Sequence, residues 1–208
     1  RLKVSEIRKD DELCIVKNTT INTKLEVSCV TVSNLNAANY SYEGYVKDEK
    51  IIETYRTDGP VHFTKFNVYT DTLRHGDQVI EEGKIIQSNL RDKTFSDLLE
   101  EQRKYLDDFW ENADVLIEGD EDLQEGIRFN LYQLLQSVGK DPYSNIAAKG
   151  LSGEGYEGHY FWDTEIYIFP VFLMTKPEIA KNLLLHRYSI LDAARERARE
   201  MGHEKGAL

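Results

Sequence analysis

The sequence GLSGEGYEGHYFWDTEIYIFP, at residues 150–170, combines a glycine-rich loop, a run of aromatic residues and several carboxylates in one short segment. Three of its glycines, Gly153, Gly155 and Gly158, match the G-x-G-x-x-G pattern of dinucleotide-binding loops. That pattern holds a pyrophosphate only where a hydrophobic strand precedes it and a helix begins within it. A polar loop at residues 141–152 precedes it here. We therefore interpret these glycines as turn formers, or as positions where the backbone lies close to a ligand.

The aromatic run that follows, His159–Asp163, has the side chains that sugar recognition requires. An aromatic ring stacks on the C–H face of a pyranose, and a carboxylate accepts two hydrogen bonds from neighbouring hydroxyls. The alternative is an aromatic core cluster in which Asp163 is the N-cap of the next helix. The two interpretations are compatible, because helix ends often line binding sites.

Helical patterns flank this segment on both sides. Before it, Thr94 or Ser96 is expected to cap one amphipathic helix. Asp120 is expected to open a second helix, with Gly139 as its C′ residue. The spacing of apolar residues in both helices predicts one buried face.

After the loop, two further helices are predicted. An apolar helix is expected over about residues 162–174, and another over about residues 177–200. Pro177 stands at a favourable first position of the second, because a proline there loses no helical hydrogen bond.

The residues before 92 are rich in short β-type runs. Residues 21–33 and 61–70 show partial alternation of apolar and polar side chains, and residues 84–89 read as one last strand. Strands at this spacing, separated by turn formers, indicate an antiparallel sandwich or barrel. Strands followed by helices indicate two parts in series and exclude a βαβ fold.

The segment at residues 150–170 closely resembles the signature of glycoside hydrolase family 65. This family includes maltose, trehalose, kojibiose and nigerose phosphorylases and a few hydrolases such as acid trehalase. FNLYQLLQS at residues 129–137 is similar to the first helix of the family's catalytic domain. AARERAREMGHEKGAL at residues 193–208 is similar to the segment that precedes a further aromatic motif. The resemblance covers residues 95–208 well and the β-rich part loosely.

The resemblance implies an N-terminal β-sandwich, a helical linker and an (α/α)6 barrel. We therefore predict a mixed, two-part fold. The end of an antiparallel β-sandwich is expected at residues 1–92, and a helical linker at 93–117. The first helices of an incomplete (α/α)6 barrel are expected at 118–208, so that the chain is a fragment of a longer enzyme.

The family's reaction implies roles for four residues of the signature. Phosphate attacks the anomeric carbon with inversion while a glutamic acid protonates the leaving sugar oxygen. By resemblance, Trp162 and Asp163 hold the glucose ring, and His159 and Glu165 support it. The general acid is expected beyond residue 208, so no catalytic residue is assigned and this chain alone is expected to be inactive. Inorganic phosphate is a co-substrate, and no cofactor or metal is expected.

The function expected of the intact protein is phosphorolysis of an α-linked glucose disaccharide to β-glucose 1-phosphate and a free sugar. One alternative is a hydrolase of the same family, such as a trehalase. The other, of a different class, is a carbohydrate-binding module without catalysis. The resemblance also implies a homodimer of the intact enzyme.

Composition narrows the possible partners of the chain. Its 208 residues carry a formal net charge of −11, and an acidic field repels nucleic-acid backbones. No apolar run approaches the roughly 18 residues that a membrane-spanning helix needs. We therefore expect no nucleic-acid or membrane partner and a cytoplasmic protein.

Cys14 and Cys29 lie in separate apolar runs, and the sequence has no C-x-x-C motif or Cys/His cluster. A structural zinc site is therefore not expected. Two buried free thiols are expected, and a disulfide would require the two runs to be neighbouring strands.

Overall fold

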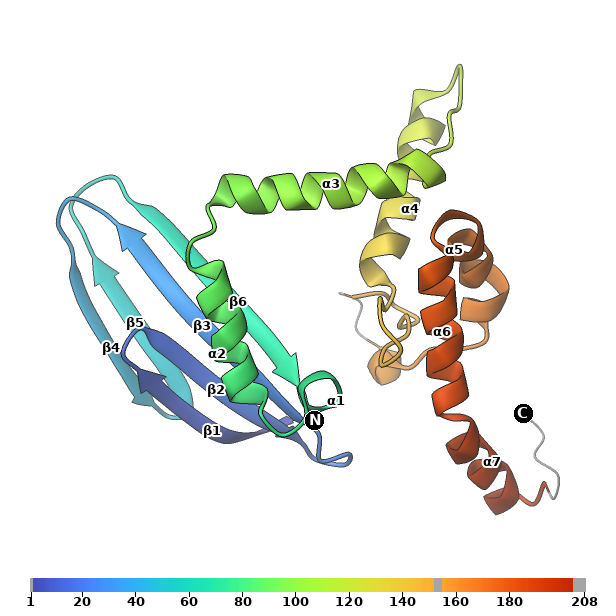
Figure 1. Ribbon diagram of the computed structural model, residues 1–208, viewed down its shortest axis with the longest axis horizontal. Coiled ribbons are helices and arrows are strands. Elements are labelled where there is room, and N and C mark those ends of the chain that lie inside the picture. The colour runs from blue at the N-terminus through green and yellow to red at the C-terminus, as the bar shows by residue number, and fades with distance from the viewer. Residues whose placement is uncertain (1, 152–154, 204–208) are drawn as a thin grey trace. The chain divides into compact units, whose positions relative to one another are not determined.

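The computed structural model describes residues 2–151 and 155–203 (Figure 1). The chain divides into two compact units, Arg1–Leu98 and Leu99–Leu208. Antiparallel sheets come first and helices follow, which confirms the predicted fold class.

The first unit contains a four-stranded antiparallel sheet with the strand order β1-β2-β3-β6. A separate antiparallel hairpin is formed by β4 and β5, and two helices follow β6. These elements are β1 (Leu2–Asp10), β2 (Leu13–Thr20), β3 (Glu26–Asn36), β4 (Ser41–Lys47), β5 (Lys50–Arg56), β6 (His62–Asp71), α1 (Thr72–His75) and α2 (Val79–Leu90).

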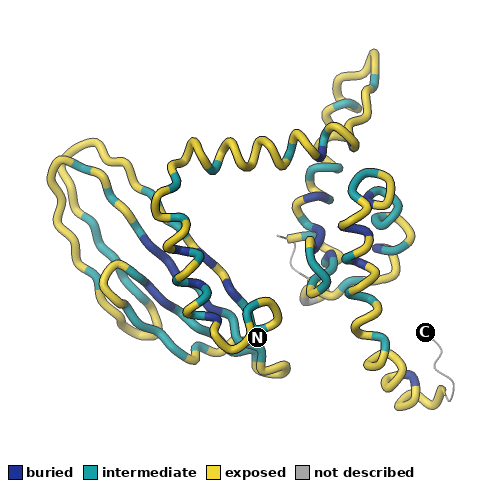
Figure 2. The backbone as a smooth tube through the Cα atoms, viewed as in Figure 1, coloured by how far each residue is buried: buried dark blue, intermediate teal, exposed yellow. Residues whose placement is uncertain are grey.

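Helix α2 covers one face of the four-stranded sheet, and the core of the first unit lies between them (Figure 1). The central stretches of the strands are coloured as buried in Figure 2. Ile15, Val30 and Val79 are almost completely inaccessible to solvent. Two buried hydroxyls, of Ser28 and Thr70, donate to the Val79 carbonyl at 3.1 and 2.6 Å. They tie the first turn of α2 to the sheet and satisfy polar groups that burial would otherwise penalise.

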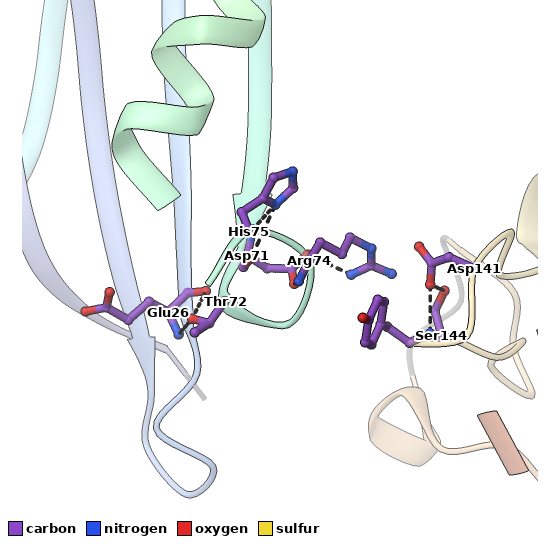
Figure 3. A network of polar contacts seen from close by, with 8 residues as sticks. Glu26, Asp71, Thr72, Arg74, His75, Asp141 and Ser144 are labelled. Atoms are coloured by element: carbon purple, nitrogen blue, oxygen red, sulfur yellow. Dashed lines mark hydrogen bonds and ion pairs between the residues drawn. The ribbon is translucent and has the colours of Figure 1, made fainter. Parts of the chain in front are cut away.

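A short turn joins the sheet to α2. The Asp71 carboxylate accepts a hydrogen bond from the Arg74 backbone N–H at 3.1 Å and pairs with the Arg74 guanidinium at 2.6 Å (Figure 3). The Thr72 hydroxyl accepts from the Glu26 N–H at 2.7 Å and donates to the Glu26 carbonyl at 3.1 Å. The end of β6 is therefore fastened to the start of β3.

The strand predicted at residues 84–89 is wrong, because these residues belong to α2. The buried positions of α2 are Val79, Gly83 and Gln87, which recur every four residues. A short apolar run does not distinguish a strand from a helix, and here the helical period controls burial.

The two cysteines are free. Strands β2 and β3 are neighbours, but Cys14 lies opposite Thr31 and Cys29 opposite Val16. Such diagonal positions are about 7–8 Å apart, which exceeds the usual Cα separation across a disulfide. The expectation of free thiols is confirmed, but only Cys14 is buried, whereas Cys29 is half-buried.

The second unit is helical. Helix α3 starts in the first unit and continues into the second unit. Two short helical turns, η1 and η2, precede α5 of the second unit. Its elements are α3 (Phe95–Ala113), α4 (Glu121–Ser137), η1 (Tyr156–Gly158), η2 (Thr164–Ile168), α5 (Phe169–Thr175), α6 (Pro177–Ser189) and α7 (Leu191–Glu200). Its core is contributed by α3, α4, the following loop, α5 and α6: Phe109, Ala113, Leu135, Val138, Ile146, Phe172, Ile179, Ala180 and Leu183.

Both predicted helix starts are confirmed by their caps. The Thr94 hydroxyl accepts from the Asp97 N–H at 3.2 Å, and the Asp97 carboxylate accepts from the Thr94 N–H at 2.8 Å. This reciprocal pair is a capping box with aspartate in place of glutamate. Asp120 caps α4 by accepting from the Leu123 N–H at 2.9 Å.

Gly139 occupies the predicted C′ position of α4, directly after the Val138 cap, but it lacks the left-handed backbone that often favours glycine there. Helix α4 ends at an extended Val138 (φ −74, ψ 140), and Gly139 is not among the residues of positive φ in the described chain. A Cβ on Gly139 would lie 2.5 Å from the Ser144 carbonyl oxygen. The glycine therefore permits close approach of the next loop, where Asp141 accepts from the Ser144 hydroxyl at 3.2 Å (Figure 3).

The helix predicted at residues 177–200 is two helices, although Pro177 starts the first as expected. Ile190 lies between them with φ −98 and ψ 5. The Ser189 hydroxyl donates to the His186 carbonyl at 2.8 Å. This local bond competes with the backbone ladder at the end of α6.

Candidate functional site

The glycine-rich loop makes its turns with left-handed backbone. Gly155 and Gly158 have φ of 111 and 81, and Tyr156 between them has φ 51. The interpretation of these two glycines as turn formers is confirmed, while Gly153 lies outside the described residues. A left-handed conformation favours glycine because a Cβ would collide with the backbone.

His159 closes this loop on itself. Its backbone N–H donates to the Tyr156 carbonyl at 2.8 Å, and its Nδ1 lies 2.7 Å from the same oxygen. Its own carbonyl accepts from the Ala148 N–H at 3.0 Å. The described contacts of His159 therefore hold the loop that leads to the aromatic run.

Trp162 and Asp163 present exposed side chains at the end of this run. Trp162 is 76% exposed and Phe161 is 44% exposed, so these rings are not a core cluster. Asp163 has helical backbone angles (φ −53, ψ −30) and makes no capping hydrogen bond. Asp163 therefore stands at the N-cap position of η2 without the capping bond that the alternative requires, and the residue is exposed.

The turn that carries these two residues opens into a π-helix, η2. The Trp162 carbonyl accepts from both the Glu165 and the Ile166 N–H groups, at 3.0 and 3.2 Å. Thr164, next to Asp163, is 4% exposed and anchors the turn in the interior. Wide turns of this kind are frequent at functional sites because the extra residue re-aims its neighbours.

Two cavities of the second unit meet at Phe161, which lines both. Asp163 lines one of about 430 Å³, together with Tyr156 and Thr164. Trp162 lines the other, of about 810 Å³, together with Arg187. Volumes of this order accommodate small ligands such as sugars.

The four residues predicted for the site are therefore divided by the structure. Trp162 and Asp163 line adjacent cavities, whereas His159 and Glu165 line neither. Glu165 is half-buried, and both of its carboxylate oxygens accept hydrogen bonds from Arg187, at 3.0 and 2.6 Å.

The sequence analysis did not identify Arg187, on α6, as a residue of the site. Its guanidinium carbon lies 4.6 Å from the centroid of the Tyr160 ring, in addition to the bidentate pair with Glu165. The hydrogen bond to Glu165 raises the pKa of Arg187, and burial raises the pKa of the Tyr160 phenol. Arg187 is 22 residues from Glu165, and no local spacing rule connects two residues at that distance.

Within the described ranges, no group of three His, Cys, Asp or Glu side chains is arranged to hold a metal ion. No described helix is long and apolar enough to cross a membrane.

Comparison with known proteins places the second unit in a family. The glycosyl hydrolase family 65 central catalytic domain matches residues 128–208. An alpha,alpha-trehalose phosphorylase of Geobacillus stearothermophilus is 57% identical over all of this chain, which covers 27% of that protein. A kojibiose phosphorylase of Caldanaerobacter subterraneus subsp. tengcongensis is 38% identical over 83% of this chain and 21% of that protein.

A solved structure described as a candidate kojibiose phosphorylase from the human microbiome agrees in fold. It superposes with a TM-score of 0.78 at 28% sequence identity, over 97% of this chain and 27% of that chain. The chain thus spans about a quarter of the length of these relatives. The family resemblance of residues 150–170 is confirmed, and the chain belongs to glycosyl hydrolase family 65.

Proposed function

We propose that the protein is an inverting phosphorylase that converts an α-linked glucose disaccharide and phosphate to β-glucose 1-phosphate and a free sugar. The observation that supports this most strongly is the 57% identity with a trehalose phosphorylase along the whole chain. Trehalose is the first substrate to test, because a second trehalose phosphorylase, from Thermoanaerobacter brockii, is 65% identical over 55% of the chain.

In this proposal, Trp162 and Asp163 hold the glucose whose anomeric carbon reacts. The exposed indole of Trp162 offers an apolar face to the ring, and the exposed Asp163 carboxylate accepts hydrogen bonds from ring hydroxyls. Positive charge develops on the ring in the transition state. Fixed contacts to the hydroxyls keep the anomeric carbon in line with the attacking oxygen.

The reaction forms a bond from a phosphate oxygen to the anomeric carbon as the bond to the leaving sugar oxygen breaks. That oxygen must take a proton from a carboxylic acid. We assign this acid to no residue of the chain. Glu165 is unsuitable because Arg187 binds both of its carboxylate oxygens, which leaves neither oxygen free to reach the leaving sugar.

The test is an assay of the full-length protein with trehalose, kojibiose, maltose and nigerose, each with and without inorganic phosphate. NMR of the products identifies the anomer of glucose 1-phosphate. Phosphate-dependent release of the β-anomer from one disaccharide is expected. Release of glucose without phosphate would instead establish the hydrolase alternative, and binding without turnover would establish the carbohydrate-binding module.

We also propose a cytoplasmic homodimer. The product is a charged phosphate ester, which crosses a lipid bilayer poorly, so an enzyme that supplies it to metabolism acts inside the cell. The homodimer rests on resemblance to other family members. Light scattering of the full-length protein should give twice the chain mass, and the chain mass at every concentration would refute this assembly.

A further inference from the structure

The turn that presents Trp162 and Asp163 has its two ends held by one side chain. Tyr160 stands two residues before Trp162, and Glu165 stands two residues after Asp163. Arg187 contacts both, through the face of the Tyr160 ring at 4.6 Å and through two hydrogen bonds to the Glu165 carboxylate. One guanidinium therefore spans the segment that carries the exposed pair.

Arg187 itself extends from a firmly packed helix. Ile179, Ala180 and Leu183 of α6 are buried in the core of the second unit. The Asn182 side chain donates to the Lys140 carbonyl at 2.9 Å. Because the core holds this helix in place, a side chain that extends from it can fix the position of the groups that it binds.

The geometry requires an arginine. A guanidinium is a planar fork that binds a carboxylate through two parallel bonds and also stacks on an aromatic face. A lysine ammonium keeps the charge but lacks the fork. The side chains of Arg187 and Glu165 are 41% and 29% exposed, so solvent weakens the pair and its contribution to global stability is small. Its main effect is therefore on geometry.

We propose that Arg187 is a positioning residue, which clamps Tyr160 and Glu165 and thereby fixes the orientation of Trp162 and Asp163 toward the sugar. This inference rests on the proposed function for its kinetic consequence. A displacement of about 1 Å at a binding group can cost roughly 100-fold in rate. Arg187 acts through the turn, so its loss should lower kcat more than it raises KM for phosphate.

The kinetic test compares Arg187→Lys with wild type in the full-length protein. A fall in kcat of about 10- to 100-fold is expected, because the lysine loses the bidentate fork. The KM for phosphate should change little and Tm should stay within a few degrees. Arg195→Lys is the matched control, because Arg195 also forms an ion pair, with Asp192, but lines neither cavity.

A double-mutant cycle tests whether Arg187 acts through Glu165. Arg187→Ala and Glu165→Ala should each lower kcat, and the double variant should be little worse than either, since both break the same clamp. Additive losses would contradict the proposed link. Wild-type kcat in Arg187→Lys, or a loss that is explained entirely by a smaller folded fraction, would overturn the proposal.

A readout that needs no turnover separates this inference from the proposed function. The full-length protein is labelled with 5-fluorotryptophan, and the ¹⁹F signal of residue 162 is assigned with Trp162→Phe. Arg187→Lys should shift or broaden this signal and leave that of Trp110, which packs on Phe109 at 5.0 Å, unchanged. Inactive wild type would refute the proposed function, whereas an unaltered signal of residue 162 would refute the clamp.

Discussion

Gly83 on α2 faces Val30 on β3 so closely that an added Cβ would lie 2.7 Å from the Val30 Cγ2 methyl. Helix α2 can pack on the sheet at this distance only because residue 83 has no side chain. Gly83→Ala should destabilise the protein by about 1–3 kcal/mol, because overpacking exceeds the gain of about 1 kcal/mol in helix propensity. Thermal or urea unfolding of the first unit measures the change.

The control for this prediction is Gly126→Ala. Gly126 lies within α4, and a Cβ there would meet no atom within 4 Å. This variant should be more stable than wild type by about 0.5–1 kcal/mol, since only the propensity gain applies. Equal effects of the two substitutions would refute the close packing of α2 on β3.

The start of α3 should loosen in acid. The hydroxyl and backbone N–H of Thr94 donate to the Asp97 carboxylate and lower its pKa. A lowered pKa in the folded state stabilises the cap above the ordinary pKa of about 4, and the effect is lost as pH falls through the folded value. The protection factors for hydrogen exchange at the N-terminus of α3, corrected for the intrinsic exchange rate at each pH, should therefore fall below about pH 4, and Asp97→Asn should remove that dependence on pH.

The Cys14 thiol should be unreactive in the folded protein. Burial, with a smaller effect from the nearby Glu53 carboxylate, raises its pKa to about 11. At pH 8 about one thiol in a thousand is then a thiolate, and the thiolate is the nucleophile. Iodoacetamide should modify Cys14 only after unfolding, as mass spectrometry of the digested protein would show. Rapid labelling at pH 8 in native buffer, with Cys29→Ser as background, would contradict this packing.

Raised pKa values also have a consequence for stability at high pH. The pKa of Cys14 is higher when folded than the value of about 8.5 expected of an exposed thiol. The buried site favours the neutral thiol over the thiolate. The free energy of unfolding therefore keeps its full value below the unfolded pKa and falls as pH rises toward about 11. Cys14→Ala should therefore reduce the fall in Tm between pH 8 and pH 10, and an unchanged slope would exclude the thiol as its cause.

Sequence reasoning succeeds here where the determining chemistry is local. The starts of α3 and α4 were predicted from Thr94 and Asp120, because a capping bond reaches only three residues along the chain. The signature at residues 150–170 likewise led to the correct family, because it is long and contiguous.

The predictions failed where distant segments decide the structure. Residues 84–89 are helical because α2 packs on the sheet through positions that recur every four residues, and the sheet is formed by residues far away in the sequence. Gly139 was placed correctly at C′, but the close approach of Ser144, which requires a glycine there, could not be predicted from the helix pattern. Arg187 reaches Glu165 from another helix. Exposure of Trp162 and Asp163 could not be predicted either, since an aromatic run reads equally well as core.

Asp163→Asn is the most direct test of the sugar-holding role. The amide is nearly isosteric and the side chain is exposed without a capping bond, so Tm should be unchanged. The amide accepts weaker hydrogen bonds from the ring hydroxyls than a carboxylate, so kcat/KM for the disaccharide should fall by about 10²- to 10³-fold. Asp192→Asn, whose side chain is 96% exposed on α7, should retain wild-type kinetics. Wild-type kcat/KM in Asp163→Asn would remove Asp163 from the site and leave Trp162 as the group to be examined next.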